Sequence, residues 1–500
     1  MKKRGPQEFS FTIKTPVHVG SGEKLGKIDF ILQTNQCVII NIDDFLYELR
    51  DNPSALNEFG GEHFNISNFL KQYKIPQGKV QRYSLPNPDN IKPFNIQELV
   101  KTGMGNPLLP GTSIKGAIRT VILWHLFKNA DQGKIADTLN TILNSNVKKE
   151  QADGDLDHFL FGSNPNHDFM RSLQVGDVEF NLSDMRLLET KVLSLTQDNG
   201  FGWKKMGKDG FNDPNPKKAT SICCESLALG ATSNGRIKMD NFLFADTPAV
   251  KQELGFSDKR EMIADLPQKC NEYAKTFIAG EIAFFENCRM NDMVSFYTAL
   301  QEEIPQGNDS FILHLGWGSG WRGMTGNYLS EDNLEAFKKR FGLGKLSFPV
   351  FPKTRKIAFE KEKPKYPLGW IKIEKIKEEM TRQGQPVPIT ITTVTQKPKT
   401  QSELEKNFEA FRLSPSPENF NKFIDTIKEE DTAELEKLSF KGLKNSVNIG
   451  FASPLIEADM PLDLRKILAI KMLEVLEKNK KWSDDKLAKY KKLQEMVKQN

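Results

Sequence analysis

Two basic residues, Lys115 and Arg119, stand four positions apart in a segment that reads LPGTSIKGAIRT (residues 109–120). At this spacing they share one face of a helix. The apolar residues around them point the other way, namely Ile114, Ala117, Ile118 and Val121. The turn before them predicts a helix that ends near Asn129, which the hydroxyl residues of the turn, Thr112 and Ser113, can cap. A helix start attracts anions, so a phosphate contact is one interpretation and a solvated charged face is the other. The spacing does not fit a Walker A loop.

A second segment, LGWGSGWRGMTG, contains five glycines in eleven positions and follows a strand-like run. Glycine lets backbone amides approach a polyanion closely, and tryptophan and arginine can stack on unpaired bases. A tight turn with buried tryptophans is the alternative interpretation. The residues concerned are Gly316, Trp317, Gly318, Ser319, Gly320, Trp321 and Arg322.

Other residues that could do chemistry are isolated. Asp29 has no acidic neighbour in sequence for paired-carboxylate or two-metal catalysis. The six histidines, His18 among them, have no cysteine or carboxylate at ligand spacing. We therefore expect no metal site, no cofactor and no catalytic residue beyond the weak candidate Asp29. Five lysines form either a solvated loop or an electrostatic footprint for RNA: Lys204, Lys205, Lys208, Lys217 and Lys218.

The composition limits the function classes. With 70 basic and 65 acidic side chains the net charge is only +5, so any nucleic-acid site must be local. Five cysteines without a CxxC pair argue against a disulfide framework or a zinc site and favour a reducing cytoplasm. No run of about 18 apolar residues occurs, which predicts a chain that neither spans a membrane nor is secreted.

The elements that must position these residues alternate in an α+β manner. The apolar pattern predicts a strand at 8–19, a glycine turn at 20–22, a strand hairpin at 28–42, a helix at 43–50, an exposed mobile loop at 193–218, a hairpin turning at Asn234-Gly235 and one long helix at 258–287. Proline and threonine then mark an extended linker before several charged amphipathic helices. The predicted domains are 1–375, a linker at 376–402 and a helical region at 403–500.

Three motifs in this order resemble the RAMP superfamily of CRISPR-associated proteins: TPVHVGSGE (15–23), PGTSIKGAIR (110–119) and the glycine-rich stretch 316–326. Within it, the chain is most similar to the subunits that cap the three-prime end of the guide RNA in type III-A Csm complexes. The resemblance implies a modified RRM-like (ferredoxin-like) core with insertions. Its implied RNA contacts are His18, Ser113, Lys115, Arg119 and the glycine-rich residues 316–322.

The resemblance also implies partners: the guide crRNA, a neighbouring RAMP backbone subunit and the small subunit, and host ribonucleases as a further expectation. Asp29 stands where backbone subunits carry a target-cleaving aspartate, but capping subunits are not credited with cleavage, so the chain is not expected to be an enzyme. One alternative is a RAMP endoribonuclease that processes precursor crRNA, which needs a general base such as His18 or a strained RNA geometry. Another is an adaptor whose C-terminal helices recruit a host nuclease.

Overall fold

The computed structural model describes residues 7–59, 64–152, 154–196, 200–205, 212–245, 247–325, 328–344 and 350–376, and then 404, 406–408, 411, 417–427, 435, 455, 461–475 and 484–498. The chain divides into two compact units, Met1–Met380 and Thr381–Asn500. The predicted linker lies outside the described residues, apart from Ile376.

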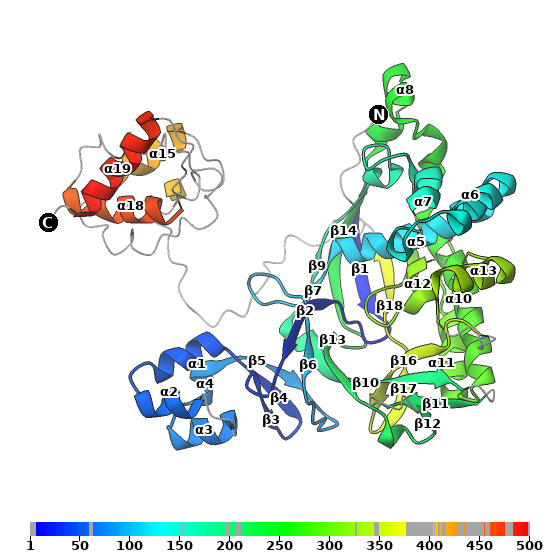
Figure 1. Ribbon diagram of the computed structural model, residues 1–500, viewed down its shortest axis with the longest axis horizontal. Helices are drawn as coiled ribbons and strands as arrows, with labels where there is room; N and C mark the ends of the chain where they lie inside the picture. Colours follow the sequence, from blue (N-terminus) through cyan, green and yellow to red (C-terminus); the bar gives the residue numbers. More distant parts are fainter. Residues whose placement is uncertain are drawn as a thin grey trace, which may run out of the picture. The chain divides into compact units, whose positions relative to one another are not determined.

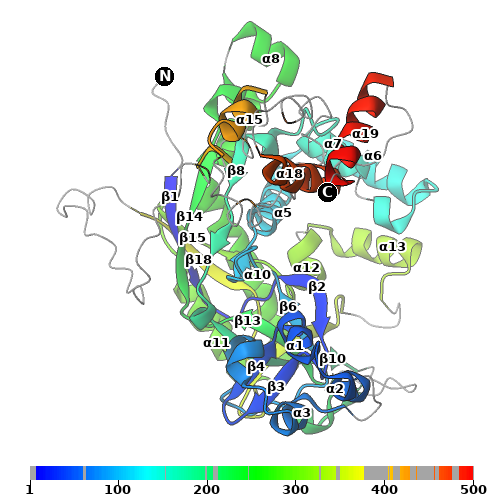
Figure 2. The same cartoon turned by 90° about the vertical axis from the view of Figure 1, so that its left-hand side faces the viewer.

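The core of the first unit is a five-stranded sheet with the order β15-β18-β1-β14-β8. These strands are β1 (Gln7–Ile13), β8 (Leu173–Val175), β14 (Thr232–Met239), β15 (Ser310–His314) and β18 (Trp370–Lys375). Figure 1 shows β1, β14 and β18 side by side, and Figure 2 labels all five strands. Alternate residues of β1, namely Phe9, Phe11 and Ile13, are buried. They share one apolar core with α5 (Gly111–Asn129) and α10 (Leu266–Asn287). Every second side chain of this strand therefore faces the helices.

The order of the elements identifies the fold of this core. Strand β1 leads to α5, then to β8 and β14, then to α10 and finally to β18. The neighbours β18-β1-β14-β8 thus give the antiparallel arrangement of a β-α-β-β-α-β unit, with β15 added at the edge. The α+β, RRM-like prediction is confirmed.

A second sheet and a small lobe are built onto this core. The second sheet contains β2 (Gly20–Leu25), β6 (Ile96–Leu99), β10 (Met185–Leu195), β11 (Phe201–Lys204), β12 (Asn212–Asp213), β13 (Ile222–Leu227), β16 (Thr354–Glu360) and β17 (Lys363–Tyr366). The lobe pairs β3 (Phe30–Gln33), β4 (Gln36–Ile40) and β5 (Gln81–Pro86) and carries α1 (Ile42–Leu49), α2 (Pro53–Phe59), α3 (Ile66–Gln72) and α4 (Gln77–Val80), at the lower end of Figure 1. It is an insertion between β2 and β6.

The remaining described elements are mostly helical. In the first unit they are α6 (Gln132–Asn144), α7 (Gly154–Phe161), α8 (Pro248–Leu254), α9 (Arg260–Ala264), α11 (Asn291–Glu302), α12 (Gly320–Thr325), α13 (Glu331–Phe341) and the short pair β7 (Leu108–Leu109) and β9 (Val178–Glu179). The second unit contains α15 (Pro417–Ile424), α18 (Leu462–Val475) and α19 (Asp484–Lys498) around Phe411, Phe423 and Leu468. None of the described helices is both long and apolar enough to cross a membrane.

The predicted hairpin turn at Asn234-Gly235 is wrong, because both residues lie inside β14. The turn between β13 and β14 comes earlier, at Gly230, which has a φ of +83°. Gly235 serves packing instead. A Cβ atom there would lie 2.6 Å from Val178 and 2.8 Å from Phe11.

Three other predicted segments also differ from the structure. The glycine turn at 20–22 is the start of β2, and the exposed loop at 193–218 contains the end of β10 together with β11 and β12, with Trp203 buried. The long helix is interrupted at Asp265, where α9 ends and α10 begins. Proline has no backbone N–H to donate, and the first turn of a helix requires none. The proline in the first turn of α10 therefore fits a new helix start better than a helix interior.

Candidate nucleic-acid interface

The glycine loop (residues 315–320) runs from β15 along the segment that contains His18. The backbone N–H of Trp317 donates a hydrogen bond of 2.8 Å to the carbonyl oxygen of His18. Gly316 has a φ of +77°, and a Cβ atom on it would lie 2.8 Å from that same oxygen. The chain itself therefore requires glycine at this position.

The next glycines differ in their surroundings. Gly318 has a φ of +107°, and a Cβ atom on it would lie 2.8 Å from the side chain of Leu368. Gly320 has a φ of +67° and no neighbour within 4 Å of a Cβ position. Ser319, between them, donates its backbone N–H to the carbonyl of Gly316. Open backbone for a ligand is thus found at Gly320 rather than along the whole loop.

Both tryptophans of the predicted site are half-buried against protein groups. The ammonium of Lys356 lies 4.5 Å from the centre of the Trp317 ring, and the His18 ring meets that ring edge-on at 5.6 Å. Trp321 meets Phe351 edge-on at 5.0 Å. Base stacking on either ring remains a prediction.

Arg322 follows in α12 and is also half-buried. Burial lowers the pKa of its guanidinium, and the charge of Arg355 lowers it further. No carboxylate forms an ion pair with Arg322 in the described part of the chain. A half-buried cation without an ion pair is suited to bind an anionic ligand.

The start of α5 is capped differently from the prediction. Pro110 precedes the helix and provides no side-chain cap, and Ser113 lies within the first turn. The Asp177 carboxylate accepts the N–H of Gly111 at 2.7 Å instead. A carboxylate therefore already occupies part of the anion-binding helix start. Lys115, one turn along, is half-buried, and burial lowers the pKa of its ammonium.

Arg119 is committed to contacts within the chain. Its guanidinium lies 2.6 Å from Asp168 and 3.0 Å from Asp157, and it covers the ring of Phe161 at 3.7 Å. These partners come from the segment after α6 and hold it against α5. The structure thus keeps Lys115 and Arg119 on one helix face, but only Lys115 is without an ion pair among the described residues.

His18 lies inside the protein, only 2% exposed. Its Nδ1 atom is 2.7 Å from the carbonyl oxygen of Glu225, and burial lowers the pKa of the ring. The sequence-based inclusion of the His18 side chain among RNA contacts does not fit this position. The backbone of His18 contributes to the site instead, because its carbonyl oxygen accepts the hydrogen bond that holds the glycine loop.

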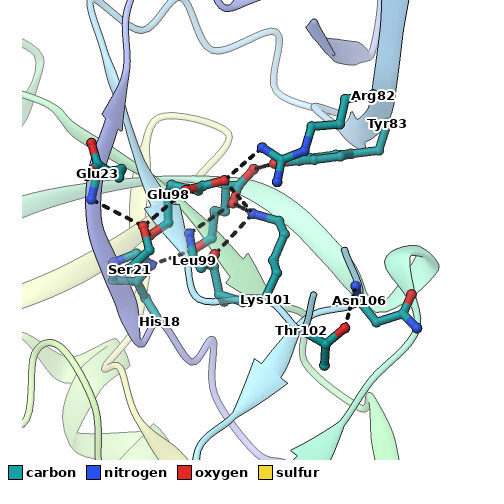
Figure 3. A network of polar contacts seen from close by, with 11 residues as sticks. His18, Ser21, Glu23, Arg82, Tyr83, Glu98, Leu99, Lys101, Thr102 and Asn106 are labelled. Atoms are coloured by element: carbon teal, nitrogen blue, oxygen red, sulfur yellow. Dashed lines mark hydrogen bonds and ion pairs between the residues drawn. The ribbon is translucent and has the colours of Figure 1, made fainter. Parts of the chain in front are cut away.

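Beside His18 lies a buried polar network that the sequence analysis missed (Figure 3). The Glu225 carboxylate, fully buried in β13, is 2.5 Å from the Lys101 ammonium and accepts hydrogen bonds from the Tyr83 hydroxyl at 2.6 Å and the Leu99 N–H at 2.9 Å. The signal was available, since Glu225 interrupts the apolar run ICCESL.

The network extends to the surface through Glu98. Its carboxylate contacts Lys101 at 3.3 Å, Arg82 at 3.1 Å and the Ser21 hydroxyl at 3.0 Å. Partial burial raises the pKa of Glu98, but Lys101, Ser21 and Arg82 outweigh it and hold that pKa below its ordinary value. This network links β2, β5, β6 and β13, and its role is therefore structural.

Asp29 stabilises a turn. Its carboxylate accepts the N–H of Gly26 at 2.6 Å. No group of three or more histidine, cysteine, aspartate or glutamate side chains that could hold a metal ion occurs among the described residues. Asp29 thus has a local structural partner within a turn.

The lysines near β11 and β12 are partly paired. Lys205 lies 2.9 Å and Lys218 lies 3.8 Å from Asp213, and Lys217 lies 2.7 Å from Glu362. Lys208 lies outside the described residues. Lys204 forms no ion pair within the described part.

The family model described as "RAMP superfamily" matches residues 10–453. A CRISPR system protein named Csm5 from Methanocaldococcus jannaschii is 22% identical over 404 residues, which covers 73% of this chain and 88% of that relative. A protein of the same name from Streptococcus thermophilus is 24% identical over 139 residues, covering 23% of this chain and 37% of that relative.

Solved structures of similar fold include the following example. It is a chain from the cryo-EM structure of a Csm–crRNA–target RNA ternary complex of a type III-A CRISPR-Cas system. The two chains superpose with a TM-score of 0.56 at 22% identity, over 74% of this chain and all of the other.

Proposed function

Because the chain belongs to the RAMP superfamily, we propose that it is a guide-RNA-binding subunit of a type III-A Csm effector complex that caps the three-prime end of the guide and helps its maturation. The observation that carries the proposal is the match over 88% of the length of a relative named Csm5. Its partners are then the crRNA, the neighbouring RAMP backbone subunit and the small subunit.

The cations near the glycine loop support RNA binding by this chain. Arg322, Lys356 and Lys204 form no ion pair among the described residues, and Lys115 is similarly available on α5. Local cations of this kind supply phosphate contacts in a protein whose net charge is only +5. Such contacts position the backbone of an RNA without reading its sequence.

The experiment is to assemble the Csm complex with and without this chain and to sequence the three-prime ends of the bound guides. We expect a defined end with the chain present and longer, heterogeneous ends in its absence. Crosslinking should place the last guide nucleotides on this chain. An unchanged end distribution, together with crosslinks to other subunits only, would contradict the proposal.

Both candidate residues for the endoribonuclease alternative, His18 and Asp29, are engaged within the chain. His18, the general-base candidate, is buried and engaged with the carbonyl of Glu225. Asp29 is engaged with the N–H of Gly26. We expect precursor RNA to stay intact when it is incubated with the purified chain in chelator. We also expect Asp29→Ala to leave every target fragment of the assembled complex in place, whereas loss of one fragment would make this chain a nuclease subunit.

Recruitment of host ribonucleases by the C-terminal helices stays a separate prediction. Deleting the residues beyond Gln401 tests it, because the first unit has its own apolar core. Guide trimming should fail in the deletion variant, and guide binding should persist, if these helices recruit the nuclease.

A further inference from the structure

A cavity of about 270 Å³ lies between the glycine loop, α10 and β16. Four cationic side chains and a single carboxylate line it: Lys204, Arg322, Arg355, Lys356 and Glu281. The lining is therefore strongly basic, although the whole chain is nearly neutral.

The carboxylate is already used. Arg355 donates from Nε to one oxygen of Glu281 at 2.6 Å and from a terminal nitrogen to the other at 2.7 Å. This bidentate ion pair neutralises the charges of both groups. Arg322, Lys356 and Lys204 are left without an ion pair in the described part of the chain.

Burial makes two of these unpaired cations costly, Arg322 and Lys356, whereas Lys204 is exposed. Burial lowers the pKa of Lys356, and the charge of Lys204 adds to that effect. The Arg322 Nε atom is buried and has no hydrogen-bond partner among the described residues. Buried polar atoms without a partner are rare in folded proteins. Anionic oxygens in the cavity would offset the cost of burying the charges of Arg322 and Lys356.

His314 also lines the cavity, and one nitrogen of its ring has no hydrogen-bond partner among the described residues. Its Nε2 atom lies 2.8 Å from the carbonyl oxygen of Leu368, so that nitrogen carries the hydrogen. Burial lowers the pKa of the ring to about 4, so the ring is neutral at pH 7. Its Nδ1 atom is then a buried acceptor without a partner among the described residues. A ribose hydroxyl is a donor of the required kind.

From this arrangement we infer that the cavity binds the terminal ribonucleotide of an RNA, with its phosphate monoester between Arg322 and Lys356. The volume lies just below the roughly 300–1,000 Å³ typical of small-molecule sites, so it suits one nucleotide rather than a strand passing through. A monoester carries a charge of about −1.5 to −2 near neutral pH, more than a diester, and so matches several unpaired cations. The inference rests on the proposed function, because that function brings an RNA end to this chain.

The test compares two RNA oligonucleotides with the full chain, identical except for a three-prime phosphate or a three-prime hydroxyl. The phosphorylated RNA should bind at least about tenfold more tightly, as charge-assisted hydrogen bonds would give. Arg322→Gln and Lys356→Gln should each reduce that ratio. Lys205→Gln is the matched control, because Lys205 is paired with Asp213 outside the cavity. Equal affinities of the wild-type chain for both RNAs would overturn the inference.

Thermal melting of the wild-type chain with uridine 3′-monophosphate, with uridine and with inorganic phosphate provides the second measurement. The monophosphate should raise the melting temperature more than either of the others. If neither RNA binds, the proposed function is wrong. The shift in melting temperature with the monophosphate then decides by itself whether the cavity binds a nucleotide. A shift with the monophosphate but equal affinities for the two RNAs would mean a site for free nucleotides and would overturn the assignment to an RNA end.

Discussion

The Lys101 ammonium lies 2.5 Å from the Glu225 carboxylate, and both side chains are almost completely removed from solvent. Glu225 belongs to a central strand of the second sheet, and Lys101 follows the neighbouring strand β6. Removing one member of a buried pair leaves an uncompensated charge, which costs more than the pair itself contributes.

We therefore expect Lys101→Met to lower the free energy of unfolding by about 3–5 kcal/mol, measured by urea denaturation. Arg82→Met is the matched control. Arg82 contacts the rim of the same network, its side chain is 44% exposed, and its loss should cost less than about 1 kcal/mol. The double variant Lys101→Met with Glu225→Leu should be more stable than the sum of the single changes predicts. Equal losses from Lys101→Met and Arg82→Met would refute the assignment.

The glycine loop yields a second comparison. A Cβ atom at Gly318 would meet Leu368 at 2.8 Å, but one at Gly320 would meet nothing within 4 Å. Both residues have positive φ, but the +67° of Gly320 lies in the left-handed helical range, whereas the +107° of Gly318 lies outside it, so backbone strain adds to the contact with Leu368. Gly318→Ala should lower the melting temperature clearly more than Gly320→Ala. Similar melting temperatures for the two variants would show that the loop is free to move away from Leu368.

The amino-acid sequence predicts much of the core correctly. The period-two pattern of Phe9, Phe11 and Ile13 and the apolar face of α5 are local signals, and both fit the structure. The dipeptide Asn234-Gly235 gave a wrong turn prediction. Its glycine is needed for packing against Phe11, but the same dipeptide is also typical of hairpin turns. Only the three-dimensional neighbour distinguishes the two causes.

The candidate site shows the same limit. The glycine loop and Arg322 lie together in chain and in space, so their association was predictable from sequence. Glu281 and Lys356 join them from α10 and β16, elements far away in the chain. Pairings of this kind depend on the fold, as does the pairing of Arg119 with Asp168. Spacing along one helix could not reveal that Arg119 was already neutralised.

His314 predicts a pH dependence of stability. Its pKa is about 4 in the folded chain, below its usual value near 6.5, because the ring is buried. The unfolded chain therefore binds a proton between these two pH values and the folded chain does not, so stability is present above about pH 6.5 and is lost as the pH falls toward 4. The full loss is on the order of 3 kcal/mol. Urea denaturation of wild type and His314→Gln at pH 7.5 and 5 measures it, and the variant should show a smaller loss. An unchanged pH profile would contradict the buried neutral ring.

Substitutions of Lys115 and Arg119 should have different effects, although the two residues share one helix face. Arg119 bridges Asp157 and Asp168, whereas Lys115 has no ion pair among the described residues. We expect Lys115→Gln to weaken RNA binding uniformly across sequences and to reduce the slope of log affinity against log salt by about one, since one phosphate contact is lost. Its melting temperature should stay close to that of wild type. Arg119→Gln should lower the melting temperature, because it leaves two carboxylates uncompensated beside Phe161, and it should change the salt slope little once the protein is folded. Fluorescence anisotropy over a salt series, with melting curves of the same samples, measures both effects. A reduced slope in Arg119→Gln with an unchanged slope in Lys115→Gln would reverse these roles.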